Sequence, residues 1–282
     1  MFSTRNSDLK MVIADLDGTL LNNDRKIGLK DYSTLIKLGV SGILRVIATG
    51  RSLYSCLKVL VSDCPFDYLV FSSGAGIMDW KTKKIIFTSS IEKRGILEIE
   101  AALRKLNLNF SIQFPIPENH HYYFYKGNYN NTDFDYRNEL YSAFNAELNG
   151  SYPLDSASQF LIILNDEGLI QNIKELFPAY KIIRATSPID NQSIWIEIFN
   201  LEVSKAKGGK YICQLKGIPE INTLGIGNDY NDLDLLDWVS HSFIVANAPE
   251  PIKRMYNQCA DNQNNPLTDS LNLLSFDFDK IN

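Results

Sequence analysis

The sequence predicts an α/β fold in which a parallel-sheet core is interrupted by an inserted α+β unit. Short apolar runs alternate with helical patterns over residues 10–80, and the same texture resumes after residue 200. Between them lie aromatic stretches with alternating polarity. Strand–helix–strand repetition of the first kind is typical of a parallel sheet with right-handed crossovers. We therefore expect a core domain of residues 1–81 and 201–282, with a second domain of residues 82–200 inserted into it.

Composition is that of a soluble globular protein that can form two unequal domains. The chain has 282 residues, of which 45% are hydrophobic and 22% charged, and a formal net charge of −5. It shows no basic block, which argues against nucleic-acid or membrane binding, and no signal-peptide or transmembrane-length apolar run. The four cysteines lack metal or redox spacing, so we expect reduced thiols in a cytoplasmic protein.

The first half of the core follows from three apolar runs. Residues 11–14 are too few for an independent helix and suit a strand that is buried on both faces. Further strands are predicted over residues 43–48 and 68–71, and helices over residues 31–38 and 52–61.

The inserted unit is predicted as a sheet with helices on one side. In residues 194–199 every second residue is isoleucine, which indicates one apolar face. The other expected strands cover residues 110–114, 121–126, 160–164 and 180–185, with helices over residues 92–106, 136–148 and 168–177. His120, His121 and the tyrosines that follow them are interpreted as part of a half-buried strand.

The core pattern resumes with a predicted helix over residues 205–215, strands over 223–227 and 242–245, and a helix over 233–238. Polar residues stand where four of the core strands end: Asp15, Thr49, Asn228 and Asn247. Because open α/β sheets bind ligands outside the carboxyl ends of their strands, these residues predict a site at one edge.

Two carboxylates of the opening motif suggest acid–base chemistry. Asp15 and Asp17 are two residues apart, so both can face one site in different surroundings. One can stay ionised as a nucleophile or metal ligand while the other holds a proton. The alternative is an ordinary turn with two solvated aspartates.

Taken together, the polar segments resemble the four motifs of haloacid dehalogenase-like (HAD) phosphatases. The matching residues are Asp15-Leu16-Asp17-Gly18-Thr19, Thr49-Gly50-Arg51, Lys205 and Gly227-Asn228-Asp229-Tyr230-Asn231-Asp232. The insertion resembles the α/β cap of the Cof-type branch, and the resemblance covers residues 10–274. It implies a Rossmann-like core with a C2B-type cap.

The resemblance implies a Mg²⁺-dependent phosphatase. Asp15 would attack phosphorus to form an aspartyl-phosphate, and Asp17 would protonate the leaving alcohol. Thr49 and Lys205 would complete the catalytic set. The implied metal ligands are Asp15, Asp17, Asn228, Asp229 and Asp232. The implied substrate-binding residues are Thr49, Gly50, Arg51, Lys205, Asn231 and Asn247.

Three positions leave alternatives open. The family usually has glycine directly after the motif lysine, so Lys207 competes with Lys205 for that role. Arg51 can bind phosphate or only pair with a carboxylate. Asn228 stands where the family usually has aspartate, and an amide brings no charge to a cation.

The expected partner is a small phosphorylated metabolite, most simply a sugar phosphate, bound by a monomer or homodimer. A phosphotransferase or mutase that uses the same intermediate is the enzymatic alternative. The non-enzymatic alternative is a catalytically silent relative that only binds such a metabolite, which the amide of Asn228 favours.

Overall fold

The computed structural model describes residues 8–150 and 153–278, which form two compact units. The core unit consists of the described residues of Met1–Arg51, Cys56–Phe87 and Ser204–Asn282. The inserted unit consists of those of Ser52–Ser55 and Thr88–Val203. No helix in the described ranges is long and apolar enough to cross a membrane.

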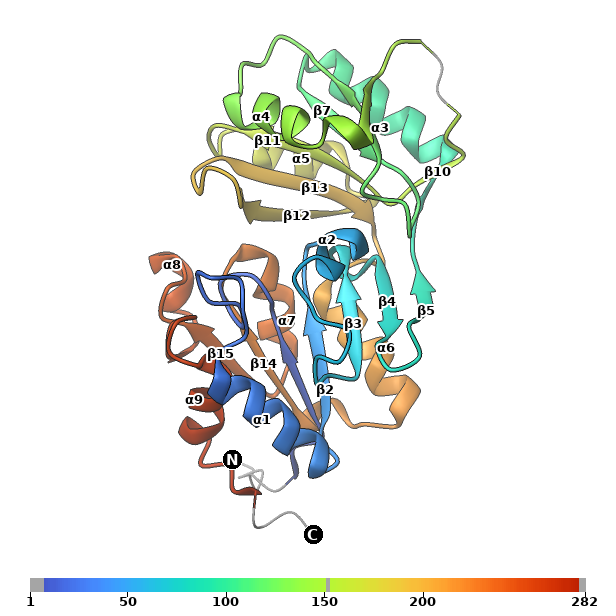
Figure 1. The fold of residues 1–282 in the computed structure, drawn as a ribbon. Coiled ribbons are helices and arrows are strands. Elements are labelled where there is room, and N and C mark those ends of the chain that lie inside the picture. The colour runs from blue at the N-terminus through green and yellow to red at the C-terminus, as the bar shows by residue number, and fades with distance from the viewer. Residues whose placement is uncertain (1–7, 151–152, 279–282) are drawn as a thin grey trace. The chain divides into compact units, whose positions relative to one another are not determined.

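The core unit contains an eight-stranded sheet with the order β16-β15-β14-β1-β2-β3-β4-β5 (Figure 1). All strands from β16 to β3 run parallel, and β4 pairs antiparallel to β3. The strands are β1 (Met11–Ala14), β2 (Leu44–Ala48), β3 (Tyr68–Phe71), β4 (Gly76–Asp79), β5 (Lys84–Thr88), β14 (Thr223–Gly227), β15 (His241–Val245) and β16 (Asn257–Cys259). The predicted α/β class with a parallel-sheet core is confirmed.

Helices bury the core sheet, which explains the uninterrupted apolar runs of its central strands. Every residue of β1 and β3 is buried. One hydrophobic cluster joins Met11 and Val70 of the sheet to Ile212 of α6 and Leu235 of α7. Figure 1 shows α1 in front of the sheet and α6 behind it. The helices of the core unit are α1 (Leu29–Val40), α6 (Lys205–Lys216), α7 (Leu233–Trp238), α8 (Glu250–Lys253) and α9 (Pro266–Leu273), and the short α2 (Leu53–Leu57) has residues in both units.

The inserted unit contains a six-stranded, mainly antiparallel sheet with the order β12-β13-β11-β7-β8-β9. Its strands are β7 (Phe110–Gln113), β8 (Tyr122–Tyr125), β9 (Asn145–Glu147), β11 (Gln159–Leu164), β12 (Tyr180–Thr186) and β13 (Ile194–Asn200). A separate two-stranded ribbon pairs β6 (Ile91–Glu92) with β10 (Ser156–Ala157). The five strands expected here from alternating polarity are confirmed as β7, β8, β11, β12 and β13.

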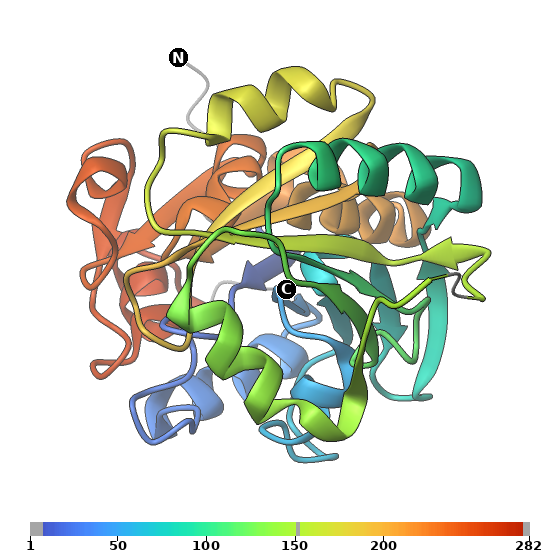
Figure 2. The same cartoon turned by 90° about the horizontal axis from the view of Figure 1, so that it is seen from above.

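Helices lie on both faces of this second sheet. Helices α3 (Lys93–Lys105) and α5 (Ile170–Leu176) share one hydrophobic cluster with Phe160 and Ile162, and Figure 2 shows them on the same side of the sheet. Helix α4 (Thr132–Leu140) packs Phe134 against Leu161 and Ile163 instead. Because neighbouring residues of a strand point to opposite faces, α4 covers the other face. The expectation of helices on one side only was therefore wrong.

Two predicted helices are shorter than their sequence patterns. The helix expected over residues 52–61 ends at Leu57, where the chain continues in turns. The helix expected over 136–148 begins earlier, ends at Leu140, and is followed by β9, which pairs with β8. In the second case tertiary pairing with a neighbouring strand outweighs helix propensity.

Among the described glycines of the core unit, Gly74 lies closest to the backbone of another segment, and this close approach allows a prediction about stability. Its φ is +106°, and a Cβ there would lie 2.3 Å from the carbonyl oxygen of Ser204, just before α6. We expect Gly74→Ala to lower the free energy of unfolding by about 3 kcal/mol or more, since backbone strain adds to overpacking. Urea unfolding measures this change.

Gly42 is the matched control. Its φ is +72°, and a Cβ there would meet nothing within 4 Å. Gly42→Ala should therefore cost only the conformational strain, about 1–2 kcal/mol. Equal losses in the two variants would show that the contact between Gly74 and Ser204 is not tight.

Candidate active site

Four adjacent strands bring the predicted polar residues to one edge of the core sheet. Asp15 follows β1, Thr49 follows β2, Asn228 follows β14, and residues 246–248 follow β15. These strands lie in the order β15-β14-β1-β2 and run parallel, so their carboxyl ends coincide. The edge predicted from the sequence is therefore where these residues meet.

A buried lysine joins two carboxylates at the centre of this edge. The Nζ of Lys205 lies 2.6 Å from Oδ1 of Asp15 and 2.6 Å from Oδ1 of Asp232. All three side chains are almost fully buried. Lys205 is the first residue of α6, and Ser204 caps this helix by accepting a hydrogen bond from the N–H of Lys207. The ammonium of Lys205 is thereby placed at the start of a rigid helix.

Burial and charge together set the protonation of this group. The pKa of Asp15 is raised to about 7, mainly by burial; the ammonium of Lys205 opposes the rise, and the charges of Asp232 and Asp17 add to it. Burial acts to lower the pKa of Lys205, but the carboxylates of Asp15 and Asp232 hold that pKa above its usual value. When both acids are ionised, one charged lysine beside two carboxylates leaves the group with one uncompensated negative charge.

One oxygen of Asp15 is left for chemistry. Among the described residues, Oδ2 of Asp15 is buried and has no hydrogen-bond partner. A buried polar atom of this kind is costly unless a ligand or ion satisfies it. An oxygen-ligated divalent cation fits the donors here, since carboxylate, carbonyl and amide oxygens are what Mg²⁺ prefers.

Asp232 holds the acidic loop in place. Its Oδ2 accepts hydrogen bonds from the backbone N–H of Asn228 at 2.9 Å and of Asp229 at 3.1 Å, while its Oδ1 accepts from Lys205. Both oxygens are thus used within the protein, and the side chain is fully buried. This geometry fits a positioning role better than direct metal ligation, and the residues that precede Asp232 in the loop, Asn228 and Asp229 among them, are only partly buried.

The second carboxylate of the opening motif has a different partner. Nε and Nη2 of Arg51 each lie 2.6 Å from an oxygen of Asp17, which makes a forked ion pair. The side chain of Asp17 is 44% exposed, whereas that of Asp15 is buried. Of the two alternatives for Arg51, the structure shows the pairing with a carboxylate.

The segment after β2 is packed between two other loops. Oγ1 of Thr49 accepts a hydrogen bond from the N–H of Arg51 at 3.2 Å. A Cβ on Gly50 would lie 3.6 Å from Nδ2 of Asn231 and 3.6 Å from Oγ of Ser73. Gly50 and Asn231 are therefore neighbours, as expected if they serve one ligand.

Asn247 is close to the opening motif but acts on its backbone. Its Nδ2 donates to the carbonyl oxygen of Gly18 at 2.9 Å, and its Oδ1 accepts from the N–H of Asn262 at 3.0 Å. Gly18 has a φ of +71°, and a Cβ there would lie 2.5 Å from Nδ2 of Asn228. The turn after Asp17 thus needs glycine both for its conformation and for the room that Asn228 takes.

Two supporting elements were not predicted from the sequence. Asn262 holds Asn247 from a distant turn. The turn of Ser72, Ser73 and Gly74 follows β3 with positive φ at all three residues. This turn lies against the residue before Lys205, as the close approach of Gly74 to Ser204 shows. The run of small residues after β3 was its only signal in the sequence.

Comparison with known families gives one match over most of the chain. A family model described as haloacid dehalogenase-like hydrolase matches residues 12–267. This range includes all four motif segments and the inserted unit.

Curated relatives and solved structures agree with that match. The chain is 24% identical over 262 residues to 5-amino-6-(5-phospho-D-ribitylamino)uracil phosphatase of Bacillus subtilis, covering 90% of each chain. A phosphatase of the haloalkanoate superfamily from Bacteroides thetaiotaomicron has a TM-score of 0.80 at 17% identity, with 98% of this chain and 99% of that chain covered. A subclass IIB sugar phosphatase has a TM-score of 0.71 at 17% identity, with 95% and 100% covered. The structural likenesses show a shared fold.

The buried lysine generates a stability prediction with a defined pH dependence. Lys205→Met should lower the free energy of unfolding at neutral pH by about 3–5 kcal/mol, because Asp15 and Asp232 lose their counter-charge. Burial raises the pKa of Asp15, and the variant lacks the lysine that lowers it, so the folded variant loses stability as pH rises and Asp15 ionises. The difference in the free energy of unfolding between the parent and Lys205→Met should therefore be smaller at about pH 5 than at about pH 8.

Lys207→Met is the matched control, two residues along the same helix and half-buried. We expect it to change the free energy of unfolding by at most about 1 kcal/mol at either pH. Denaturant unfolding of the parent and both variants at each pH measures the two differences in the free energy of unfolding. A loss for Lys205→Met that is no larger than the loss for Lys207→Met would contradict the buried ion cluster.

Proposed function

Since the chain belongs to the haloacid dehalogenase-like hydrolase family, we propose that it is a Mg²⁺-dependent phosphatase of small phosphorylated metabolites that forms an aspartyl-phosphate. The observation that carries the proposal is the different hydrogen bonding of the two carboxylate oxygens of Asp15. Its Oδ1 is held by Lys205, and its buried Oδ2 has no hydrogen-bond partner among the described residues. A carboxylate that is fixed at one oxygen and open at the other is suited to in-line attack.

The proposed reaction has two displacements at phosphorus. Oδ2 of Asp15 attacks, the bond from phosphorus to the leaving oxygen breaks, and Asp17 gives its proton to the departing alkoxide. Asp17 then takes a proton from a water that attacks phosphorus, which frees inorganic phosphate and restores Asp15. The ammonium of Lys205 offsets negative charge on Asp15 and the phosphoryl group.

The forked pair between Arg51 and Asp17 belongs to the resting site in this proposal. Both oxygens of Asp17 accept charge-assisted hydrogen bonds from Arg51 at 2.6 Å, so in this arrangement neither is free to face a leaving group. A phosphate dianion that draws the guanidinium of Arg51 to itself would release Asp17 to act as an acid. Substrate binding and acid function would then be coupled through one side chain.

The divalent cation is proposed to rest on Asp15, the backbone carbonyl of Asp17, and the loop residues Asn228 and Asp229. When bound, Mg²⁺ neutralises charge on the phosphoryl oxygens. Asp232, which was expected as a further ligand, is proposed instead to hold the loop, because both its oxygens already accept hydrogen bonds.

Thr49, Gly50 and Asn231 are proposed to bind the phosphate. Thr49 is buried beside the N–H of Arg51, and Gly50 lies against Asn231. Asn247, also expected to bind substrate, is proposed to fix the turn at Gly18, to which it donates.

A sugar or polyol phosphate is the proposed substrate class, with the inserted unit as a cap that sets specificity. The names of two relatives support this class, a phospho-ribitylamino-uracil phosphatase and a sugar phosphatase. The inserted sheet also buries polar groups suited to hydroxyl recognition: Nε2 of Gln159 donates to Glu197 at 2.7 Å, and Gln113 lies opposite Gln159. The four buried free cysteines support a reducing, cytoplasmic setting.

The test is phosphate release from a panel of phosphorylated sugars, polyols and nucleotides, with Mg²⁺ and with a chelator. We expect turnover only with Mg²⁺ and highest with a sugar or polyol phosphate. Asp15→Asn should abolish release, since an amide cannot form the acyl phosphate, while the variant remains folded. Release that survives in Asp15→Asn would overturn the mechanism, and binding without release by the parent would favour the silent relative. Transfer of phosphate to a second sugar would favour the phosphotransferase.

Asn228→Asp should lower the Mg²⁺ concentration that half-saturates activity, by roughly tenfold, because a carboxylate replaces an amide dipole at the cation. The preferred substrate should not change. Activity titrated with Mg²⁺ at one pH measures the shift. Asp237→Asn, at an exposed position of α7 where the side chain accepts a hydrogen bond from Tyr256, is the control for a changed surface charge. A variant that needs as much Mg²⁺ as the parent would place Asn228 outside the coordination shell.

A further inference from the structure

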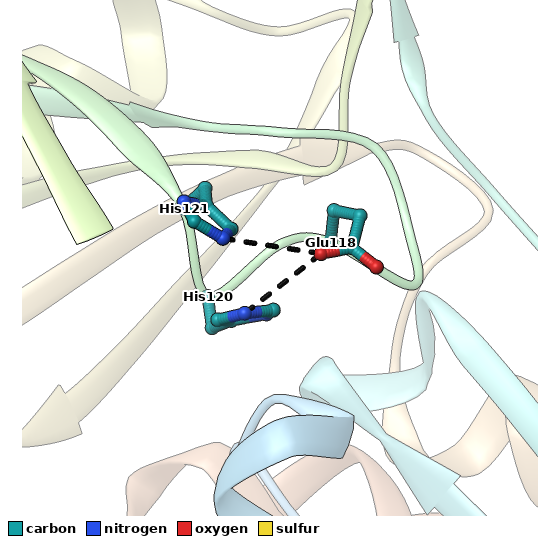
Figure 3. Close-up of side chains that lie close together, drawn as sticks. All are labelled: Glu118, His120 and His121. Atoms are coloured by element: carbon teal, nitrogen blue, oxygen red, sulfur yellow. Dashed lines mark ion pairs between the residues drawn. The ribbon is translucent and has the colours of Figure 1, made fainter. Parts of the chain in front are cut away.

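A cluster of metal-ligating side chains lies in the inserted unit and has no part in the proposed reaction. Glu118, His120 and His121 stand on the loop between β7 and β8 (Figure 3). Two backbone hydrogen bonds close this loop: Phe114 donates to the carbonyl of His121 at 3.0 Å, and His121 donates to the carbonyl of Glu118 at 2.9 Å. The three side chains are therefore presented by a short, internally bonded segment.

Both imidazoles converge on the same carboxylate oxygen. Nε2 of His120 lies 3.8 Å and Nε2 of His121 lies 3.9 Å from Oε2 of Glu118, and Figure 3 shows both rings directed at it. The three donor atoms all lie within 4.8 Å of one another. A tetrahedral ion with bonds of about 2.1 Å separates its ligand atoms by roughly 3.4 Å. The two distances to Glu118 are thus about half an ångström longer than the spacing that one ion requires, and the distance between the two imidazole nitrogens exceeds it by at most about 1.4 Å.

Aromatic packing orients the two rings. Phe144 meets His120 and His121 edge-on, with ring centroids 5.1 and 5.3 Å away. Tyr54, which groups with the inserted unit, stacks on His120 at 4.3 Å. The exposed fractions of the side chains are 12% for His120, 38% for His121 and 63% for Glu118. The imidazoles are held by their neighbours while the carboxylate stays open to solvent, so an ion can enter.

We propose that Glu118, His120 and His121 form a binding site for a zinc-like transition-metal ion. Two imidazole nitrogens and one carboxylate oxygen are a donor set that Zn²⁺ takes, whereas Mg²⁺ prefers oxygen donors. Three protein ligands leave a fourth position for water or an anion. The distances exceed those of direct hydrogen bonds, so the ordinary alternative is a loose ion pair between histidine and glutamate.

The test is Zn²⁺ binding by calorimetry in a large excess of Mg²⁺, which fills oxygen-only sites. The parent should bind one Zn²⁺. His120→Ala and His121→Ala should each weaken Zn²⁺ binding by at least about 100-fold. Loss of a residue that only supports a metal ligand weakens binding by up to about that factor, so loss of a ligand itself should weaken it no less. The sequence has three histidines, and the third, His241 on β15 of the core unit, provides the matched control. His241→Ala should bind Zn²⁺ as the parent does.

Two further measurements keep the result independent of misfolding. Glu118→Gln keeps the size of an exposed side chain and should weaken Zn²⁺ binding by roughly tenfold with an unchanged circular dichroism spectrum. X-ray absorption of the zinc-loaded parent should show imidazole scattering and no sulfur, which distinguishes this site from the buried cysteines. Absence of Zn²⁺ binding, sulfur ligation, or binding that survives loss of both histidines would overturn the proposal.

Discussion

A lysine ammonium enclosed by two carboxylates is the constraint on which the rest of the core unit depends. Lys205 can remain buried only while Asp15 and Asp232 both face it, each at 2.6 Å. That requirement fixes the start of α6 against the end of β1. It also fixes the loop after β14, because Asp232 uses its second oxygen to hold the loop backbone. The glycine turn after β3 then has to clear the residue that precedes Lys205.

The two aspartates of the opening motif show how one turn supports two chemical tasks. Asp15 is buried, and burial raises its pKa, so its charge depends on Lys205 and on whatever satisfies its second oxygen. Asp17 is half-exposed and paired with an arginine from the next strand's loop. Environment rather than residue type separates their roles. In the proposed mechanism, the anionic substrate is what changes the partner of Asp17.

Much of this arrangement could be predicted from the sequence, because strand ends and apolar runs are local signals. The polar residues after β1, β2, β14 and β15 predicted a single edge, and the sheet order confirms it. The choice between Lys205 and Lys207 could not be made, since spacing alone does not say which side chain enters the core. The structure places Lys205 at the carboxylates. Asn262 was missed because its contact with Asn247 spans a turn with no periodic pattern, and β9 was read as helix because its pairing with β8 is non-local.

The order of strands in the core sheet has a consequence for synthesis on the ribosome. The central strand β1 pairs with β2, which follows it closely, and with β14, where Met11 lies opposite Thr223. The second partner therefore leaves the ribosome only after the whole inserted unit. The strands of that unit pair among themselves, so its contacts can form while β1 still has an open edge. The nascent chain must keep an apolar strand with an unpaired edge from misassociating during that interval.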